Sequence, residues 1–181
     1  MFGGENMIRI YLTNLRQYND GHIVGKWVEL PVSDDEMAGV LKEIGINEEE
    51  SEYFISDFEC DVPGIHINKN SSIDMLNDIA DQLNDLDEEE IKVCSTIMKN
   101  ENCTLDEAID QKDTRVVITL NKNVTNTDID FACSYIEQVF GDVINIDKET
   151  LARYFDFESY GQDLKMNFNT DEDETIAVSN N

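Results

Sequence analysis

The excess of acidic residues most constrains this 181-residue chain, because 40 Asp and Glu stand against 13 Lys and Arg and leave a formal charge of -27. Like charges repel one another, so a compact fold needs enough apolar residues to offset that repulsion. Hydrophobic residues make up 40% of the chain, which is sufficient for one or two packed cores. We therefore expect a folded protein whose carboxylates lie on its surface.

The same charge excludes several classes of partner. Nucleic acids and anionic membrane surfaces are both bound through Lys and Arg, which are scarce here. The chain has no apolar run of 18 residues, and its start lacks the basic and apolar regions of a signal peptide. We predict a cytoplasmic protein that binds neither nucleic acid nor membrane, and we interpret residues 1–6 as an extra leader.

The negative charge is concentrated in one part of the chain. Residues 34–90 contain 19 acidic residues and only two basic ones, so this segment carries -17 of the total of -27. A chain made acidic only for solubility would be expected to spread its carboxylates over every surface. The concentration favours a binding face.

The residue pattern predicts an α+β protein built from three small units. The first unit, residues 1–64, combines an antiparallel sheet with one amphipathic helix. An Asp-Gly turn separates the first two strands, and a Ser33–Glu36 capping box precedes the helix. The predicted elements of this unit are strands at 7–12, 23–30 and 53–60 and a helix that ends at Gly45.

The second and third units are predicted to differ in class. Residues 65–112 form an acidic helical module, with helix starts near Ser72, Asp87 and Thr104. Residues 113–170 form an α+β unit, and residues 171–181 an acidic, frayed tail. The predicted elements of the third unit are a strand at 114–120, a helix from 127 or 128 to 141, a helix capped by Asp147, and a final strand at 164–168.

The helix predicted from Ile73 to Asn84 is the most informative element. Each residue of a helix is rotated by about 100° from the one before it, so four acidic residues fall on one stripe and apolar residues occupy the opposite side. The stripe consists of Asp74, Asp78, Asp81 and Asp85. No basic residue lies three or four positions away from these acids, so the stripe gives up the ion pairs that normally steady a surface helix. An ordinary solvated helix face explains one such helix, but the further acids before and after it favour a functional surface.

The stripe matches the charge density of a nucleic acid. Carboxylates along such a helix are about 5 Å apart, close to the spacing of about 3.4 Å between the phosphates of one B-DNA strand. A protein with a DNA-binding groove could therefore accept this surface in place of its substrate.

Sequence signatures of catalysis or metal binding are not found. The four cysteines form no Cys-x-x-Cys pair, the two histidines follow no nucleophile signature, and no glycine-rich phosphate loop is present. With 40 acidic residues, close carboxylate pairs are unavoidable and carry little information. We predict a protein that is not an enzyme and has no metal site and no cofactor.

Three blocks of the sequence resemble the ArdA antirestriction family. The first runs from Ile10 to Pro31 and includes Tyr11, Gly21 and Trp27, the second is a weaker match over residues 52–59, and the third is Leu151–Leu164, which ends in Tyr160-Gly161-Gln162-Asp163-Leu164. They span nearly the whole chain in the right order. Residues 65–112 match the family in acidity and helical character rather than residue by residue.

The resemblance implies a function. ArdA proteins are elongated, dimeric, three-part mimics of bent DNA that occupy the DNA-binding groove of type I restriction-modification enzymes, and they are typically carried on conjugative plasmids and transposons. The resemblance therefore implies a non-catalytic inhibitor with a host type I enzyme as its partner. Charge then selects the residues that would stand in for phosphates. They are Asp34, Asp35, Glu36, Glu43, Glu48, Glu49, Glu50, Asp74, Asp78, Asp81, Asp85, Asp87, Glu88, Glu89 and Glu90.

The resemblance also implies a homodimer whose contact lies in the C-terminal part. Residues 115–120 are a β-branched run with few charges, so we suggest Val116, Val117, Ile118 and Leu120 as contact residues. The same run would equally suit an internal strand of the third unit. The motif residues that carry the resemblance are expected to determine the fold rather than to contact a partner. They are Tyr11, Gly21, Trp27, Tyr160 and Gly161.

Two other functions remain open from the residues alone. The first is an acidic adaptor that binds a basic, DNA-associated protein. The second is an enzyme with a carboxylate-bound divalent metal, which would need metal binding of defined stoichiometry. Inhibition of DNA cleavage by a type I enzyme separates the predicted restriction inhibitor from both of these alternatives.

Overall fold

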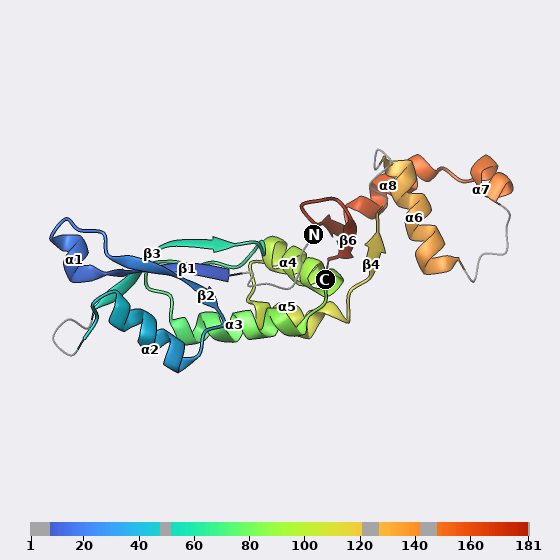
Figure 1. Ribbon diagram of the computed structural model, residues 1–181. Helices are drawn as coiled ribbons and strands as arrows, with labels where there is room; N and C mark the ends of the chain where they lie inside the picture. Colours follow the sequence, from blue (N-terminus) through green and yellow to red (C-terminus); the bar gives the residue numbers. More distant parts are fainter. Residues whose placement is uncertain (1–7, 48–51, 121–126, 142–147, 181) are drawn as a thin grey trace. The chain divides into compact units, whose positions relative to one another are not determined.

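The computed structural model describes residues 8–47, 52–120, 127–141 and 148–180 (Figure 1). Contacts divide the chain into two compact units, residues 1–91 and 92–181. Helices and antiparallel strands occur in both, which confirms the predicted α+β class. The finer division into three units stays a prediction.

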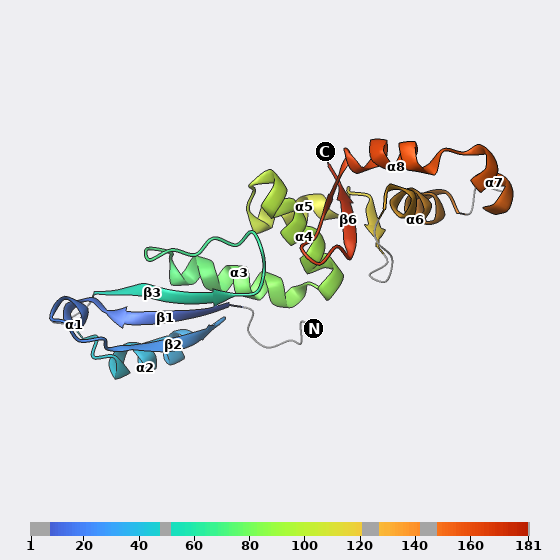
Figure 2. The same ribbon diagram turned by 90° about the horizontal axis from the view of Figure 1, so that it is seen from above.

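The first unit contains a three-stranded antiparallel sheet with the strand order β2-β1-β3, whose strands lie side by side in Figure 2. Its strands are β1 (Ile8–Asn14), β2 (Gly25–Leu30) and β3 (Tyr53–Cys60). Ile8 pairs with both Leu30 and Cys60, so β1 is the central strand. The predicted strands are confirmed, because alternating apolar residues and the turn at Gly21 are local signals.

Two longer helices lie on one side of this sheet, α2 (Asp34–Glu43) and α3 (Ile73–Asp85), and the short α1 (Leu15–Asn19) follows β1 (Figure 1). The Ser33–Glu36 capping box is present at the start of α2. The core of the unit is built from alternate residues of the strands and one face of α3. Its fully buried side chains include Ile8, Ile10, Leu12, Leu30, Leu76 and Leu83.

Two helices follow, α4 (Glu88–Glu101) and α5 (Leu105–Lys112). The predicted caps are confirmed, because Asp87 and Glu90 bond reciprocally through backbone and side chain, as do Thr104 and Glu107. Arg115 ties these helices to the end of the chain within the second unit. Its buried guanidinium donates twice to the Glu101 carboxylate, at 2.7 and 2.9 Å, and once to the Ser179 carbonyl oxygen.

The second unit contains another three-stranded antiparallel sheet, with the order β4-β6-β5. Ile118, Leu120, Phe131 and Ala177 form its buried core, and the partly buried Tyr135, Leu164 and Phe168 pack against them. The remaining elements of the unit are β4 (Val117–Thr119), α6 (Asp128–Phe140), α7 (Lys148–Tyr154), α8 (Phe157–Lys165), β5 (Phe168–Thr170) and β6 (Ile176–Ser179). The predicted cap Asp147 lies outside the described residues.

Two predictions for the C-terminal region are wrong. Of the strand expected at 164–168, Leu164 and Lys165 instead end α8, which begins where the Asp156 carboxylate accepts a hydrogen bond from the Ser159 amide, and only Phe168 belongs to a strand. The segment predicted as a frayed tail, residues 171–181, instead contains the central strand β6. Asp171 makes the tight connection possible, because its carboxylate accepts from the amides of Thr175 and Ile176 at 2.6 and 3.0 Å.

Candidate functional site

The acidic stripe of α3 is the first feature of the candidate site. Ser72 caps the helix, and Asp74, Asp78, Asp81 and Asp85 are all exposed. The opposite face buries Leu76, Ala80 and Leu83 against the rest of the first unit, and this packing fixes which side of the helix faces water. The helix and its two faces agree with the sequence pattern, while the function of the stripe stays a prediction.

The carboxylates of the stripe are not neutralised from within the part of the chain that the structure describes. No ion pair joins any of the four to a Lys, Arg or His among the described residues. Asp34 and Asp35, which are also exposed, lie in the first turn of α2, where the positive end of the helix dipole stabilises anions. These six negative charges are therefore available to a basic partner.

Other predicted acids already have partners inside the fold. Glu36 accepts hydrogen bonds from the Ser33 hydroxyl at 2.6 Å and from the Ser33 amide at 3.2 Å, and these bonds hold the pKa of Glu36 below its usual value. Glu90 accepts from the Asp87 amide at 3.0 Å. Both side chains serve to start helices, in addition to any contact with a partner.

Glu43 also has a partner inside the fold. Its exposed carboxylate pairs with the ammonium group of Lys26, which lies on β2, so its charge is partly neutralised. The contribution of Glu43 to the surface offered to a partner stays a prediction. Glu88 and Glu89 are exposed in the first turn of α4, whereas Glu48, Glu49 and Glu50 lie outside the described residues.

Sequence reasoning missed Asn77, which lies on α3 between two of the stripe residues. Its side-chain amide accepts from the Val32 amide and donates to the Val32 carbonyl oxygen, with both distances 2.9 Å. Val32 directly precedes the cap of α2, so this pair of bonds joins α3 to the start of α2. A single Asn within a helix gives no sign of such a partner 45 residues away.

The residues predicted for a dimer contact differ in burial. Ile118 and Leu120 are buried in the core of their own unit, so their side chains are not available to a second chain and are removed from that prediction. Val116 is 41% exposed, and Val117 is half-buried. The outer edge of β4 is partly covered, because Gln138 donates to the Thr119 carbonyl oxygen and accepts from the Thr119 amide, both at 2.9 Å.

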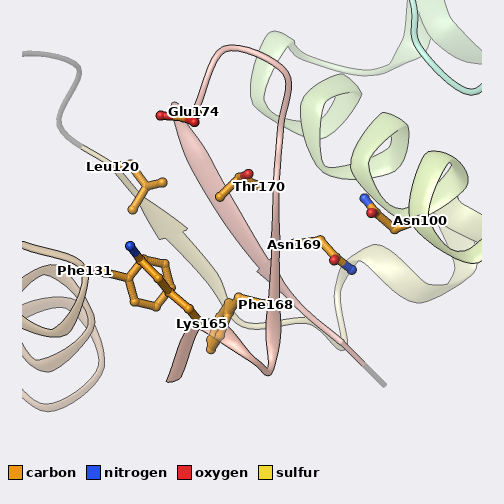
Figure 3. Close-up of a pocket in the computed structure, with 8 residues that line it drawn as sticks. All are labelled: Asn100, Leu120, Phe131, Lys165, Phe168, Asn169, Thr170 and Glu174. Atoms are coloured by element: carbon orange, nitrogen blue, oxygen red, sulfur yellow. The ribbon is translucent and has the colours of Figure 1, made fainter. Parts of the chain in front are cut away.

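A pocket of about 390 Å³ lies in the second unit (Figure 3). Its one basic lining residue, Lys165, extends beside the Phe131 ring and is ion-paired with Asp128 at 2.9 Å. This ion pair holds the pKa of Asp128 below its usual value. The described lining residues of the pocket thus offer no unpaired cation to an anionic ligand. Among the described residues, no cluster of His, Cys, Asp and Glu is arranged to hold a metal ion.

The comparisons with known proteins decide the family. The model of the family described as Antirestriction protein (ArdA) matches residues 10–175. The chain belongs to the ArdA family. No curated protein matches the sequence significantly. The match covers most of the first sheet, the acidic helices and strands β4 and β5 of the second sheet, and it ends directly before β6. None of the helices in the described residues is long and apolar enough to cross a membrane.

The residues that carry the ArdA resemblance have structural roles, as predicted. Tyr11 and Trp27 pack edge to face across neighbouring strands, with ring centroids 5.4 Å apart. Gly21 occupies the left-handed region with φ of 87°. Tyr160 packs against Phe155, and Gly161 allows α8 to approach α6. These contacts support a structural role for the motif residues, while the location of the binding residues stays a prediction.

Proposed function

We propose that this ArdA protein inhibits type I restriction-modification enzymes by occupying their DNA-binding groove in place of duplex DNA. The observation that carries the proposal is the row of four exposed carboxylates on α3 that have no cationic partner among the described residues. An uncompensated row of this kind weakens the folded state through like-charge repulsion, so folding alone does not account for it. A basic groove would relieve that repulsion on binding.

The inhibition needs no chemical step. The carboxylates would contact the Lys and Arg side chains that normally hold phosphates. The positive charge of the enzyme's groove would attract this acidic surface. Each exposed contact contributes about 0–1 kcal/mol, so affinity must come from many contacts together. The proposed surface comprises Asp34, Asp35, Glu36, Asp74, Asp78, Asp81, Asp85, Asp87, Glu88, Glu89 and Glu90.

We further propose that the protein acts in the cytoplasm as a homodimer. Two copies would double the length of the negatively charged surface, and Val116 offers an exposed apolar side chain in a region of low charge. Twenty-seven negative charges match about 46 Å of duplex DNA at the duplex charge density, and two chains match about twice that.

Titration of DNA cleavage tests the proposal. A purified type I enzyme, its cofactors and a plasmid with recognition sites are incubated with increasing amounts of this protein. We expect cleavage to stop at low micromolar inhibitor or below. Additional DNA should restore cleavage, because it competes with the inhibitor for the enzyme. Unchanged cleavage together with tight binding to a basic, DNA-associated protein would favour the adaptor function instead.

A further inference from the structure

Asn77 connects two groups of carboxylates in the first unit. It lies on α3 between Asp74 and Asp78 and is half-buried. Its carboxamide oxygen accepts from the Val32 amide at 2.9 Å, and its amide nitrogen donates to the Val32 carbonyl oxygen at 2.9 Å. One side chain thus satisfies both backbone groups of Val32, as a neighbouring β-strand would.

This contact matters because Val32 lies directly before the start of α2. The next residue, Ser33, caps α2, and Asp34 and Asp35 follow at once in the first turn. The segment before Val32 is restricted as well, because Pro31 has a fixed φ. A pair of hydrogen bonds therefore links the segment that begins α2 to the middle of α3, in addition to the packing of the buried face of α3.

A fixed distance matters to a protein that imitates DNA. The cations of an enzyme's groove occupy set positions, and an inhibitor whose carboxylates already have the matching spacing loses less conformational freedom on binding. Two acidic helices that could move independently would present the same charge with weaker affinity. Charge and spacing are thus separate requirements.

We propose that Asn77 is a positioning residue for recognition, which sets the spacing between the α2 carboxylates Asp34 and Asp35 and the α3 stripe. This inference rests on the proposed function. It differs from a general stabilising role because it assigns to an uncharged side chain an effect on affinity that the net charge does not determine.

Replacing Asn77 by Asp separates charge from spacing. Asn77→Asp adds one negative charge to α3, but it removes the donor to Val32 and places a carboxylate oxygen against a carbonyl oxygen. Asn84→Asp adds the same charge to the same helix at an exposed position outside the proposed surface. If charge alone determined inhibition, the two variants would inhibit equally and at least as well as the parent protein.

We expect Asn84→Asp to match the parent and Asn77→Asp to need at least threefold more protein for half-inhibition of type I DNA cleavage. Far-UV circular dichroism and thermal unfolding confirm that each variant is folded at the assay temperature. The salt dependence of inhibition is a second readout. A smaller slope of log affinity against log salt for Asn77→Asp indicates fewer simultaneous contacts, which a change in stability alone would not produce.

Asn77→Ala and Asn84→Ala repeat the comparison without added charge, should Asn77→Asp fail to fold. Faster hydrogen exchange of the Val32 amide in Asn77→Ala alone would confirm that the bonds exist in solution. Equal inhibition and equal salt slopes for the variants at positions 77 and 84 would overturn the positioning role while leaving DNA mimicry intact. A parent protein that does not inhibit cleavage would overturn both proposals.

Discussion

Gly161 shows how one residue limits the packing of the second unit. A Cβ atom placed there would lie 1.8 Å from the Asp128 carbonyl oxygen on α6, and the residue is buried. Backbone atoms cannot retreat as a flexible side chain can, so any larger residue forces α6 and α8 apart. The Tyr-Gly pair of the ArdA motif is therefore explained by a close approach of two helices.

We predict that Gly161→Ala lowers the free energy of unfolding by about 1–3 kcal/mol or more, because overpacking displaces a helix from its partner. Chemical denaturation of the variant and the parent measures the difference. Gly39→Ala is the matched control, since Gly39 lies within α2 and a Cβ there meets no atom within 4 Å. That control should be stabilised by about 0.5–1 kcal/mol. Equal stability of Gly161→Ala and the parent would contradict the packing explanation.

Glu36 makes stability depend on pH. Bonds from Ser33 lower its pKa in the folded state, so the charged carboxylate stabilises the fold above the ordinary pKa of a Glu, and this contribution is lost as the pH falls through the lowered value. We predict that Glu36→Gln unfolds at a lower temperature than the parent at pH 7, and that the difference shrinks progressively once the pH falls below about 4. Thermal unfolding across this pH range measures it. In a Ser33→Ala background the difference at pH 7 should shrink, and an unchanged difference would contradict the assignment.

The elements divide into those with local signals and those without. Capping boxes at Ser33, Thr104 and Thr127 were predictable, because the cap and the third residue of the helix bond to each other within one turn. The apolar alternation of β1 and the two faces of α3 were predictable for the same reason. In the candidate site, the exposure of the α3 stripe could therefore be predicted from the sequence. The ion pair between Glu43 and Lys26 could not, because it depends on how α2 packs beside β2.

The acidic composition of the C-terminal region led to a wrong prediction of its elements. Four consecutive acids at 171–174 are typical of a solvated tail, yet they form the connection between two paired strands. The strand that follows has only three apolar residues, Ile176, Ala177 and Val178, and its pairing partners lie far away along the chain as well as nearby. Asp156 and Ser159 did contain a helix-start signal for α8, which the aromatic residues around them concealed.

The α3 stripe allows a prediction at the scale of one helix. Because the contacts are weak and numerous, we expect each of Asp74→Asn, Asp78→Asn, Asp81→Asn and Asp85→Asn alone to change half-inhibition of cleavage by less than about fivefold, the equivalent of up to about 1 kcal/mol. The quadruple variant should lose inhibition by at least about 100-fold. Type I cleavage assays measure both.

The matched control removes four exposed acids from the second unit through Asp110→Asn, Glu149→Gln, Glu158→Gln and Asp163→Asn. It has the same net charge as the quadruple α3 variant, so a much smaller loss of inhibition would show that location matters. Equal losses would mean that total charge alone determines affinity. Complete loss through one single substitution would instead indicate a discrete site rather than distributed mimicry.

At the scale of the whole molecule, net charge acts on two associations in opposite directions. Two chains of -27 repel each other, and salt screens that repulsion. Binding to a basic groove is an attraction between opposite charges, which the same salt weakens. One experimental variable should therefore separate self-association from inhibition.

We predict that raising NaCl from about 50 to about 200 mM strengthens the homodimer and weakens inhibition of the type I enzyme, since the screening length falls over this range. Sedimentation velocity measures the first effect at several protein concentrations, and fluorescence anisotropy of labelled protein with the purified enzyme measures the second. Val116→Lys provides the control, because an added cation at the proposed contact reduces the repulsion between copies while it removes apolar contact area. If Val116 contributes to the interface, this variant dimerises less than the parent at high salt, where the loss of apolar contact dominates. A dimer that is equally stable at both salt concentrations and in both proteins would place the contact elsewhere and would show that charge does not control it.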